Sequence, residues 1–247
     1  MSAPRFFVPE ITADLVPGKT AALPEAAARH AARVLRLRAG DALTLFTGTG
    51  GEFAATIVSI DRNDVVARVD AFVPVERESP LFATLVQAVC ASDAMEYAVR
   101  KSVELGVGAI QPVLATRSAP LPAGDRADSR RLRWSQIAIA ACEQCGRNRV
   151  PDVRTPVTLA AWLAAREVRL PGLILAPDGG ASLSTVARSA GEFDIVVGPE
   201  GGFTGEEIAA AERAGLTALR LGPRVLRTET AGPAMLAAIH ALWGDFG

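Results

Sequence analysis

The spacing of hydrophobic and polar positions changes near residue 74, so the two parts of the chain predict different architectures. Up to Val73, short runs rich in β-branched and aromatic residues are separated by turn signals at residues 39–41, 48–51 and 61–64. Runs of this kind predict the strands of a small β-rich unit. The predicted strands cover residues 43–46, 53–60 and 65–73.

One helix interrupts this β pattern and is predicted to begin at Pro24 and Glu25. Each residue of an ideal α-helix turns the chain by about 100°, which brings Arg29, Arg33 and Arg36 within about 60° of one another around the axis. The sequence therefore predicts one basic helix face. Such a face either binds RNA phosphates or is an ordinary solvated surface.

Beyond the polar, proline-bracketed segment 74–80, apolar strands alternate with helical stretches. The predicted strands cover residues 82–89, 109–115, 172–176, 194–198 and 218–221, and the predicted helices cover residues 93–105, 130–145, 183–189, 205–214 and 233–243. This alternation indicates a buried parallel sheet with helices on both faces. We therefore expect a first domain over residues 1–73, a linker over 74–80 and an α/β domain over 81–247.

Composition is that of a globular protein, with 247 residues of which 49% are hydrophobic. No apolar run is long enough to span a membrane, and the first ten residues contain Arg5 and Glu10 where a secretory signal has an apolar core. We expect a cytoplasmic protein.

Cys142 and Cys145 lie in a helical run without a second paired motif, which favours helix packing over a metal or redox site.

The formal net charge is only −1, but the basic residues are unevenly distributed. All except Lys19 and Lys101 are arginines. Most of these fall in four clusters, which are Arg29, Arg33, Arg36 and Arg38; Arg126, Arg130, Arg131 and Arg133; Arg147, Arg149 and Arg154; and Arg220, Arg224 and Arg227. Local basic patches on a nearly neutral chain indicate a specific RNA partner rather than indiscriminate binding.

Two loops carry the candidate chemistry, and each follows an apolar strand. The first, residues 198–203, is rich in glycine, which permits positive φ and a close approach of a ligand to the backbone. Thr204 then caps the next helix, with Glu207 completing a capping box. The second loop, residues 222–230, has more charges than the start of a helix requires, although surface ion pairing is an alternative explanation. Both loops belong at the ligand-binding carboxyl edge of the sheet.

Two common nucleotide-binding motifs do not fit this sequence. The glycines at residues 198–202 lack the G-x-G-x-x-G spacing of a Rossmann fold, and the loop comes late in the chain. A P-loop is also absent, because no Gly-Lys-Ser or Gly-Lys-Thr occurs.

Residues 197–203 and 221–231 resemble the two cofactor-loop motifs of the RsmE family, the small-subunit ribosomal RNA uridine N3-methyltransferases of the SPOUT superfamily. His30 with residues 33–37, and the segments 101–107 and 141–151, extend the resemblance over most of the chain. One departure is Gly232-Pro233, where the family continues directly into an alanine-leucine helix. Since proline is tolerated in a first turn, we expect the last helix to begin at Pro233.

The resemblance implies an α/β fold with a SPOUT-type parallel sheet and a C-terminal trefoil knot, preceded by a small PUA-like β-barrel. It further implies a homodimer that binds S-adenosylmethionine and methylates 16S ribosomal RNA in the small subunit, without a metal or a membrane. The loops and the resemblance together indicate cofactor-binding residues, which are Gly198, Pro199, Glu200, Gly201, Gly202, Leu221, Gly222, Leu226 and Thr230. The candidate RNA-binding residues are His30, Arg33, Arg36, Arg147, Asn148 and Arg149.

Methylation of uridine N3 requires an oriented methyl donor, an unstacked base and loss of the N3 proton. Arg227 is the first candidate to stabilise negative charge on the uracil, with Arg147 and Arg149 as alternatives that could instead hold phosphates. Glu229 and Glu200 are the candidate proton acceptors, although either could simply orient a loop. Two other functions remain open at this point: a SPOUT relative acting on ribose or another base, and a non-catalytic RNA-binding protein, which would not need two ligand-binding loops.

Overall fold

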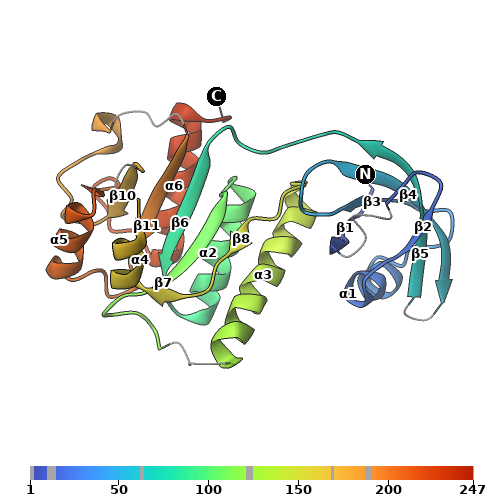
Figure 1. The fold of residues 1–247 in the computed structure, drawn as a ribbon, viewed down its shortest axis with the longest axis horizontal. Helices are drawn as coiled ribbons and strands as arrows, with labels where there is room; N and C mark the ends of the chain where they lie inside the picture. The colour runs from blue at the N-terminus through green and yellow to red at the C-terminus, as the bar shows by residue number, and fades with distance from the viewer. Residues whose placement is uncertain are drawn as a thin grey trace. The chain divides into compact units, whose positions relative to one another are not determined.

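The computed structural model describes residues 3–9, 15–61, 64–120, 125–167, 170–186 and 191–246. The chain forms two units (Figure 1). The first contains residues 1–78 together with 142–150, and the second contains residues 79–141 and 151–247. The segment 142–150 therefore belongs to the first unit, although it follows more than sixty residues of the second along the chain.

The first unit is built on a five-stranded sheet in the order β1-β3-β4-β5-β2. Its strands are β1 (Arg5–Phe7), β2 (Thr20–Ala22), β3 (Ala42–Phe46), β4 (Glu52–Asp61) and β5 (Asp64–Val73). β1 pairs parallel with β3, and the other pairs are antiparallel. The three predicted strands are confirmed, whereas β1 and β2 were missed because three residues are too few to establish an alternating pattern.

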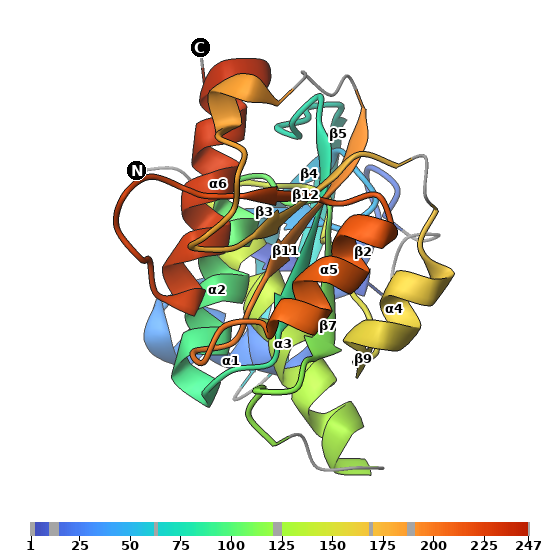
Figure 2. The same cartoon turned by 90° about the vertical axis from the view of Figure 1, so that its left-hand side faces the viewer.

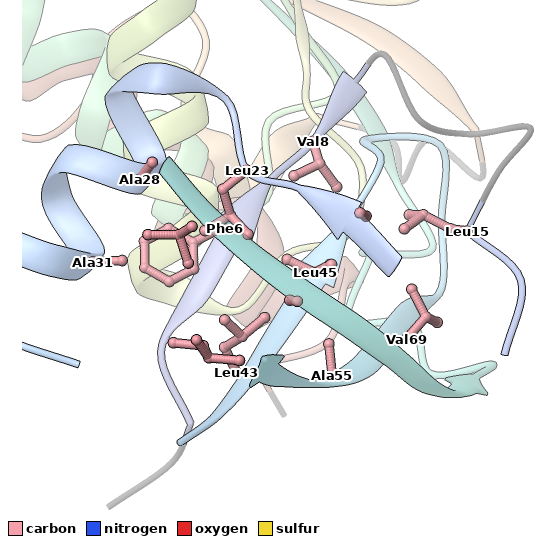
Figure 3. Close-up of a cluster of buried hydrophobic side chains, with 14 residues drawn as sticks. Phe6, Val8, Leu15, Leu23, Ala28, Ala31, Leu43, Leu45, Ala55 and Val69 are labelled. Carbon is pink, nitrogen blue, oxygen red and sulfur yellow. The ribbon is translucent and has the colours of Figure 1, made fainter. Parts of the chain in front are cut away.

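Alternation along the strands buries one face of this sheet. In β5, Val65, Ala67 and Val69 are buried while most of their neighbours are more exposed. These side chains join Phe6, Leu45 and others in a hydrophobic core, against which the helical segment at residues 25–34 packs (Figure 3). The β-rich first unit expected from the sequence is therefore confirmed.

The helical segment of this unit differs from the prediction. It starts as α1 (Glu25–Arg29) and widens into a π-helical turn, η2 (His30–Val34), in which the Leu35 N–H donates to the His30 carbonyl at 3.0 Å. Arg36 lies beyond it with φ of +54°, in the left-handed region. The continuous face formed by Arg29, Arg33 and Arg36 was therefore a wrong prediction, because the wider turn and the reversal at Arg36 end the regular 100° spacing.

The second unit is built on a parallel sheet of seven strands in the order β12-β10-β11-β6-β7-β8, with β9 also paired to β7. The strands are β6 (Phe82–Ala88), β7 (Ala109–Leu114), β8 (Asp152–Val153), β9 (Val157–Thr158), β10 (Gly172–Leu175), β11 (Glu192–Val197) and β12 (Thr217–Leu219). All its strand pairs are parallel, which confirms the predicted sheet. The five predicted strands lie within two residues of the observed ends.

Helices cover both faces of this sheet (Figure 2). α2 (Ser92–Glu104) and α6 (Thr228–Trp243) lie on one face, and α4 (Leu159–Ala165) and α5 (Gly205–Arg213) lie on the other. On the second face, Leu159 and Ala211 pack against buried strand residues such as Val86 and Val196. Because both faces are covered, β6 and β11 are almost continuously buried.

The helices expected at 130–145 and 183–189 in the second unit depart from their predicted bounds. α3 (Asp125–Cys145) begins five residues before the expected start at Arg130. In the expected helix 183–189, the described part contains only the 3-10 turn η3 (Leu183–Thr185), and residues 187–189 lie outside the described residues. Residues 62–63 of the turn expected at 61–64, and the Glu10 position, are also outside them.

The start of α6 was predicted incorrectly. The helix begins at Thr228, and Pro233 lies inside it. The Arg227 carbonyl accepts hydrogen bonds from the Thr230 and Ala231 N–H groups, both at 2.9 Å, so the first turn is closed before the proline is reached. Proline has no backbone N–H, so Pro233 lacks only the hydrogen bond to the Glu229 carbonyl, and the helix continues past it.

Membrane-spanning helices and metal-binding clusters are both absent from the described ranges. None of the helices there is long and apolar enough to cross a membrane. The same ranges contain no group of three or more histidine, cysteine or acidic side chains with the spacing to hold a metal ion.

Candidate active site

A cavity of about 1270 Å³ opens at the carboxyl edge of the parallel sheet. The residues beyond the ends of β10, β11 and β12 and the beginning of α2 line it. β10 lies between β11 and β12, so three consecutive strands of the sheet deliver their following loops to one place. All nine predicted cofactor residues line this cavity, together with Arg227 and Glu229.

Glycines have two different roles in the first loop. Gly202 has φ of +67°, and a Cβ built on it would meet no atom within 4 Å, so its backbone faces open space. Gly198 and Gly201 lack a positive φ, but a Cβ on either would press against Phe203 or Arg117 at 3.2 Å. Gly222 in the second loop resembles Gly202, with φ of +76° and open space around it. The two loops therefore present bare backbone to the cavity.

Three hydrogen bonds hold the first loop from outside. The Ala91 N–H donates to Glu200 at 2.8 Å, and the Arg117 guanidinium donates to the Gly201 carbonyl at 2.8 Å. The third comes from the Thr228 hydroxyl, which donates to the Gly198 carbonyl at 2.5 Å. Glu200 was a candidate either for accepting a proton or for orienting the loop, and its bond to Ala91 supports the second role.

The helix after this loop has the predicted capping box. The Glu207 N–H donates to the Thr204 hydroxyl at 3.2 Å, and the Thr204 N–H donates to the Glu207 carboxylate at 2.8 Å. Glu207 also accepts from the Thr116 N–H at 2.7 Å and the Thr116 hydroxyl at 3.0 Å. Burial by itself raises the pKa of Glu207, but these hydrogen bonds outweigh it and hold the pKa below its usual value.

A buried chain of hydrogen bonds joins the two loops. The Gln87 side-chain amide donates to the Thr228 hydroxyl at 2.9 Å, and that hydroxyl donates to the Gly198 carbonyl. Gln87 is fully buried on β6, and Thr228 is the first residue of α6. This pair was not predicted, although a polar glutamine within the apolar run 82–89 indicates a buried side chain that needs a hydrogen-bond partner.

Cys90 is buried behind the same cavity. Burial raises the pKa of its thiol to about 12, and the negative charges of Glu200 and Glu229 act in the same direction. A thiol with this pKa stays protonated at neutral pH, so Cys90 is not positioned as a nucleophile.

The second loop is much less constrained by its side chains. Arg220, Arg224 and Arg227 line the cavity and are exposed. Within the described ranges, no hydrogen bond or ion pair of their guanidinium groups to another protein group occurs. Glu229 follows in the first turn of α6 and is half-buried.

Several lining residues were not predicted from the sequence. They include Asp93 and Tyr97 on α2, and the segment 175–178 after β10. A signal for the latter was present, because Pro177-Asp178-Gly179-Gly180 is also a glycine-containing turn after an apolar strand. Nothing in the sequence distinguished Tyr97 from any other helix residue.

The six candidate RNA-binding residues all belong to the first unit and fall into two groups. His30, Arg33 and Arg36 are exposed, and the side chain of Arg149 is 56% exposed beside Glu76. Arg147 and Asn148 are buried. Arg147 donates to Glu78 at 2.5 Å, and the Asn148 amide donates to the Val75 carbonyl at 2.8 Å. These internal partners favour a structural role for Arg147 and Asn148 within the first unit.

The cysteines of the 141–151 motif have surroundings typical of packing residues. Cys142 is buried, and burial raises the pKa of its thiol to about 12. Its Sγ lies 3.6 Å from the Arg149 carbonyl oxygen, while Cys145 is only half-buried.

Two family models match the chain and define its class. Residues 77–240 match an RNA methyltransferase domain, and residues 23–70 match an RNA methyltransferase PUA domain. An α/β unit with a bare-backbone cavity at its strand ends, following a PUA domain, is thus an RNA methyltransferase architecture.

Similar proteins define the family more narrowly. The chain is 39% identical to the ribosomal RNA small subunit methyltransferase E of Neisseria gonorrhoeae, whose structure was solved bound to S-adenosyl methionine, with a TM-score of 0.92 and all of both chains covered. A Legionella pneumophila methyltransferase solved with bound SAM is 36% identical, with a TM-score of 0.95 over all of both chains. The Bacillus subtilis ribosomal RNA small subunit methyltransferase E is 30% identical over 95% of each chain. This chain belongs to the ribosomal RNA small subunit methyltransferase E family.

Proposed function

We propose that the protein transfers the methyl group of S-adenosylmethionine to N3 of a uridine in 16S ribosomal RNA of the small subunit. The observation that carries the proposal is the cavity at the carboxyl edge of the sheet, which gathers both glycine-rich loops, Arg227 and Glu229. The Neisseria gonorrhoeae and Bacillus subtilis relatives support the choice of RNA, since both are named as ribosomal RNA small subunit methyltransferases. The Neisseria gonorrhoeae and Legionella pneumophila proteins support the choice of cofactor, since both were solved with it.

The residues present fit S-adenosylmethionine. Pockets for drug-sized ligands commonly measure roughly 300–1,000 Å³, so a cavity of about 1270 Å³ has space for the cofactor and part of a nucleotide. Bare backbone at Gly202 and Gly222 permits a close approach, and Pro199, Gly201, Leu221, Leu226 and Thr230 would complete the contacts. Carboxylates on the lining, among them Asp93, Asp178 and Glu229, suit a cationic sulfonium. When bound, this group supplies an activated methyl.

Arg227 is proposed as the catalytic cation. Loss of the N3 proton leaves negative charge spread over the uracil ring and its two flanking carbonyls. A planar guanidinium can address a carbonyl oxygen and an adjacent atom together, which a lysine ammonium cannot do. Because the guanidinium of Arg227 is exposed to the cavity and has no partner among the described protein groups, it is available for this role. Its contribution is electrostatic stabilisation of the developing anion.

Glu229 is the proposed proton acceptor at N3. It lines the cavity two residues from Arg227 and is half-buried. Glu200 is less suited, because one of its oxygens already accepts the Ala91 N–H. Glu200 therefore serves to orient the first loop, at the edge of the cofactor.

The first unit is proposed to bind the RNA. His30, Arg33, Arg36 and Arg149 are exposed there and provide positive or polar contacts. In this assignment residues 1–73 form the RNA-binding domain, 74–80 the linker and 81–247 the methyltransferase domain, with 142–150 packed into the first unit. Family resemblance further supports a C-terminal trefoil knot, a homodimer and a cytoplasmic location.

Methyl transfer to purified small ribosomal subunits tests the proposed reaction. Subunits from cells lacking the endogenous activity are incubated with protein and tritiated S-adenosylmethionine, and digested nucleosides are identified by mass spectrometry. We expect label in 3-methyluridine. Label in a 2′-O-methylated nucleoside or another base would contradict the uridine N3 assignment, and RNA binding without any transfer would identify a non-catalytic RNA-binding protein.

A further inference from the structure

Exposed aliphatic side chains lie among arginines on one short stretch of the first unit. Val34 is 65% exposed and Leu35 is 41% exposed. Arg33, Arg36 and Arg38 flank them and are also exposed. We call residues 33–38 the arginine-aliphatic segment. Hydrophobic residues on a surface are common singly, but two adjacent ones within a positively charged stretch suggest a mixed contact surface.

The fold holds these aliphatic side chains outward. Ala28 and Ala31 point from the helical segment into the core beside Phe6 (Figure 3). Leu37 is partly buried and packs against the same core. The Leu37 N–H donates to the Ala31 carbonyl at 3.0 Å, so a hydrogen bond joins the two residues that contact the core on either side of Val34 and Leu35. Val34 and Leu35 lie between these two residues and have no place in the core.

The backbone of the segment is unusual at two positions. His30–Val34 form a π-helical turn, a feature enriched at functional sites. Arg36 follows with φ of +54°, the only positive φ of a non-glycine residue within the described ranges. A left-handed conformation in a residue with a Cβ costs free energy, and such positions cluster at binding and active sites.

We infer that Val34 and Leu35 contact unstacked RNA bases while Arg33, Arg36 and Arg38 contact the flanking phosphates. This inference rests on the proposed RNA-binding function of the first unit. Arginines alone would suffice for a regular duplex, whose outer surface offers mainly phosphate and ribose. Exposed aliphatic groups gain free energy only against an apolar surface, and in RNA that surface is the face of a base outside a continuous stack. The segment therefore fits a loop, bulge or junction of the ribosomal RNA.

The salt dependence of binding separates the two kinds of contact. Affinity for fluorescently labelled, protein-free 16S ribosomal RNA is measured over a series of salt concentrations. For the Val34→Ser/Leu35→Ser variant we expect roughly tenfold weaker binding with an unchanged slope of log affinity against log salt, because no charge is removed. For Arg33→Ala/Arg36→Ala we expect weaker binding and a slope reduced by about 1.4, which corresponds to two lost phosphate contacts on unpaired RNA.

A matched control is available on the same unit. Val58 on β4 is 41% exposed and lies outside the segment, so Val58→Ser should leave both affinity and slope unchanged. Thermal melting checks that each variant is folded. In competition, a single-stranded oligonucleotide should displace the labelled RNA from wild type better than a blunt duplex, and the serine variant should lose this preference.

Several outcomes would overturn the inference. Wild-type affinity in Val34→Ser/Leu35→Ser would exclude base contacts at these residues. Loss of self-association in that variant, seen by sedimentation, would assign the aliphatic pair to a second copy of the chain. If the arginine variant also bound like wild type while methyl transfer to small subunits persisted, RNA binding by this segment would be wrong but the proposed reaction would stand. Absence of transfer by wild type would instead contradict the proposed function itself.

Discussion

The two loops of the cavity differ in how the second unit holds them. Residues 198–203 are braced from three sides, by Ala91, Arg117 and Thr228, and lead into a complete capping box. The second loop carries two exposed arginines, Arg224 and Arg227, whose guanidinium groups have no partner among the described protein groups. This contrast fits the proposed function, in which the first loop is a preformed surface for the cofactor and the second keeps its charges available for the RNA.

Arg227 offers the strongest test of this division. Replacing a single well-placed stabilising group commonly costs on the order of a hundredfold in rate, so we expect about that loss for Arg227→Ala. Arg227→Lys keeps the charge but loses the planar fork, and we expect a loss of at least about tenfold. Single-turnover methylation at saturating cofactor and RNA measures both, beside thermal melting. Cofactor affinity should change much less, and a near-wild-type rate would make Arg227 a residue that only braces the loop.

Gly202→Val tests the preformed surface of the first loop. Valine opposes the φ of +67° and places its side chain in the open space of the cavity. We expect S-adenosylmethionine affinity, measured by calorimetry, to fall roughly tenfold or more, since positive φ alone costs a β-branched residue on the order of 1–2 kcal/mol. Gly205→Ala is the control, because Gly205 has no positive φ, has open space around it and does not line the cavity. Unchanged affinity in folded Gly202→Val would remove this loop from the cofactor site.

Thr228 lies where the two loops meet and should affect both. Thr228→Val keeps the shape but removes the hydroxyl that bonds Gly198 and Gln87, so the half-buried Gly198 carbonyl and one N–H of the buried Gln87 amide lose this partner. We expect a stability loss of about 1–3 kcal/mol and a several-fold higher KM for the cofactor. Thr228→Ser retains the hydroxyl and should recover most of both. Equal behaviour of the serine and valine variants would show that side-chain volume, rather than the hydrogen bonds, matters here.

Substitution of Glu207 should change only the stability of the folded protein, and the size of the change should depend on pH. Its pKa is lowered in the folded protein, so its ionised form adds stability above its ordinary pKa of 4.5, and this contribution is lost as pH falls through the folded value. Glu207→Gln should therefore melt slightly lower than wild type at neutral pH, and the difference should vanish in acid. Melting curves from pH 7 to about pH 3 measure this. A difference that grew on acidification would contradict the sign.

Much of the candidate site was predictable because its determinants are local. Thr204 and Glu207 form the capping box that their spacing predicted, and Gly202 adopts the positive φ that glycine permits. Apolar runs predicted the strands that carry the loops, and a parallel sheet necessarily brings its carboxyl ends to one edge. Each of these features depends on a few consecutive residues or on a rule common to the fold class.

Contacts with distant residues, and the exact ends of helices, could not be predicted from the local pattern. Arg147 and Asn148 belong to the arginine-rich motif read as RNA-binding, yet Glu78, Val75 and Arg5 occupy their polar groups. Arg36 was assigned to a helix that ends before it, and the helix with Pro233 starts five residues earlier than expected. The contacts of Arg147 and Asn148 come from residues distant in the sequence, whereas the two helix boundaries follow from hydrogen bonds between near neighbours, Leu35 to His30 and Thr230 to Arg227.

The sequence by itself determined the strands, the glycine loops and the family, because hydrophobic periodicity, backbone freedom and motif spacing are properties of contiguous residues. Only the tertiary structure decided that β10 lies between β11 and β12, that Gln87 reaches Thr228, and that Val34 and Leu35 face outward. Strand order and burial depend on which distant segments pair. Those pairings are decided by the free energy of packing the whole unit rather than by any single segment.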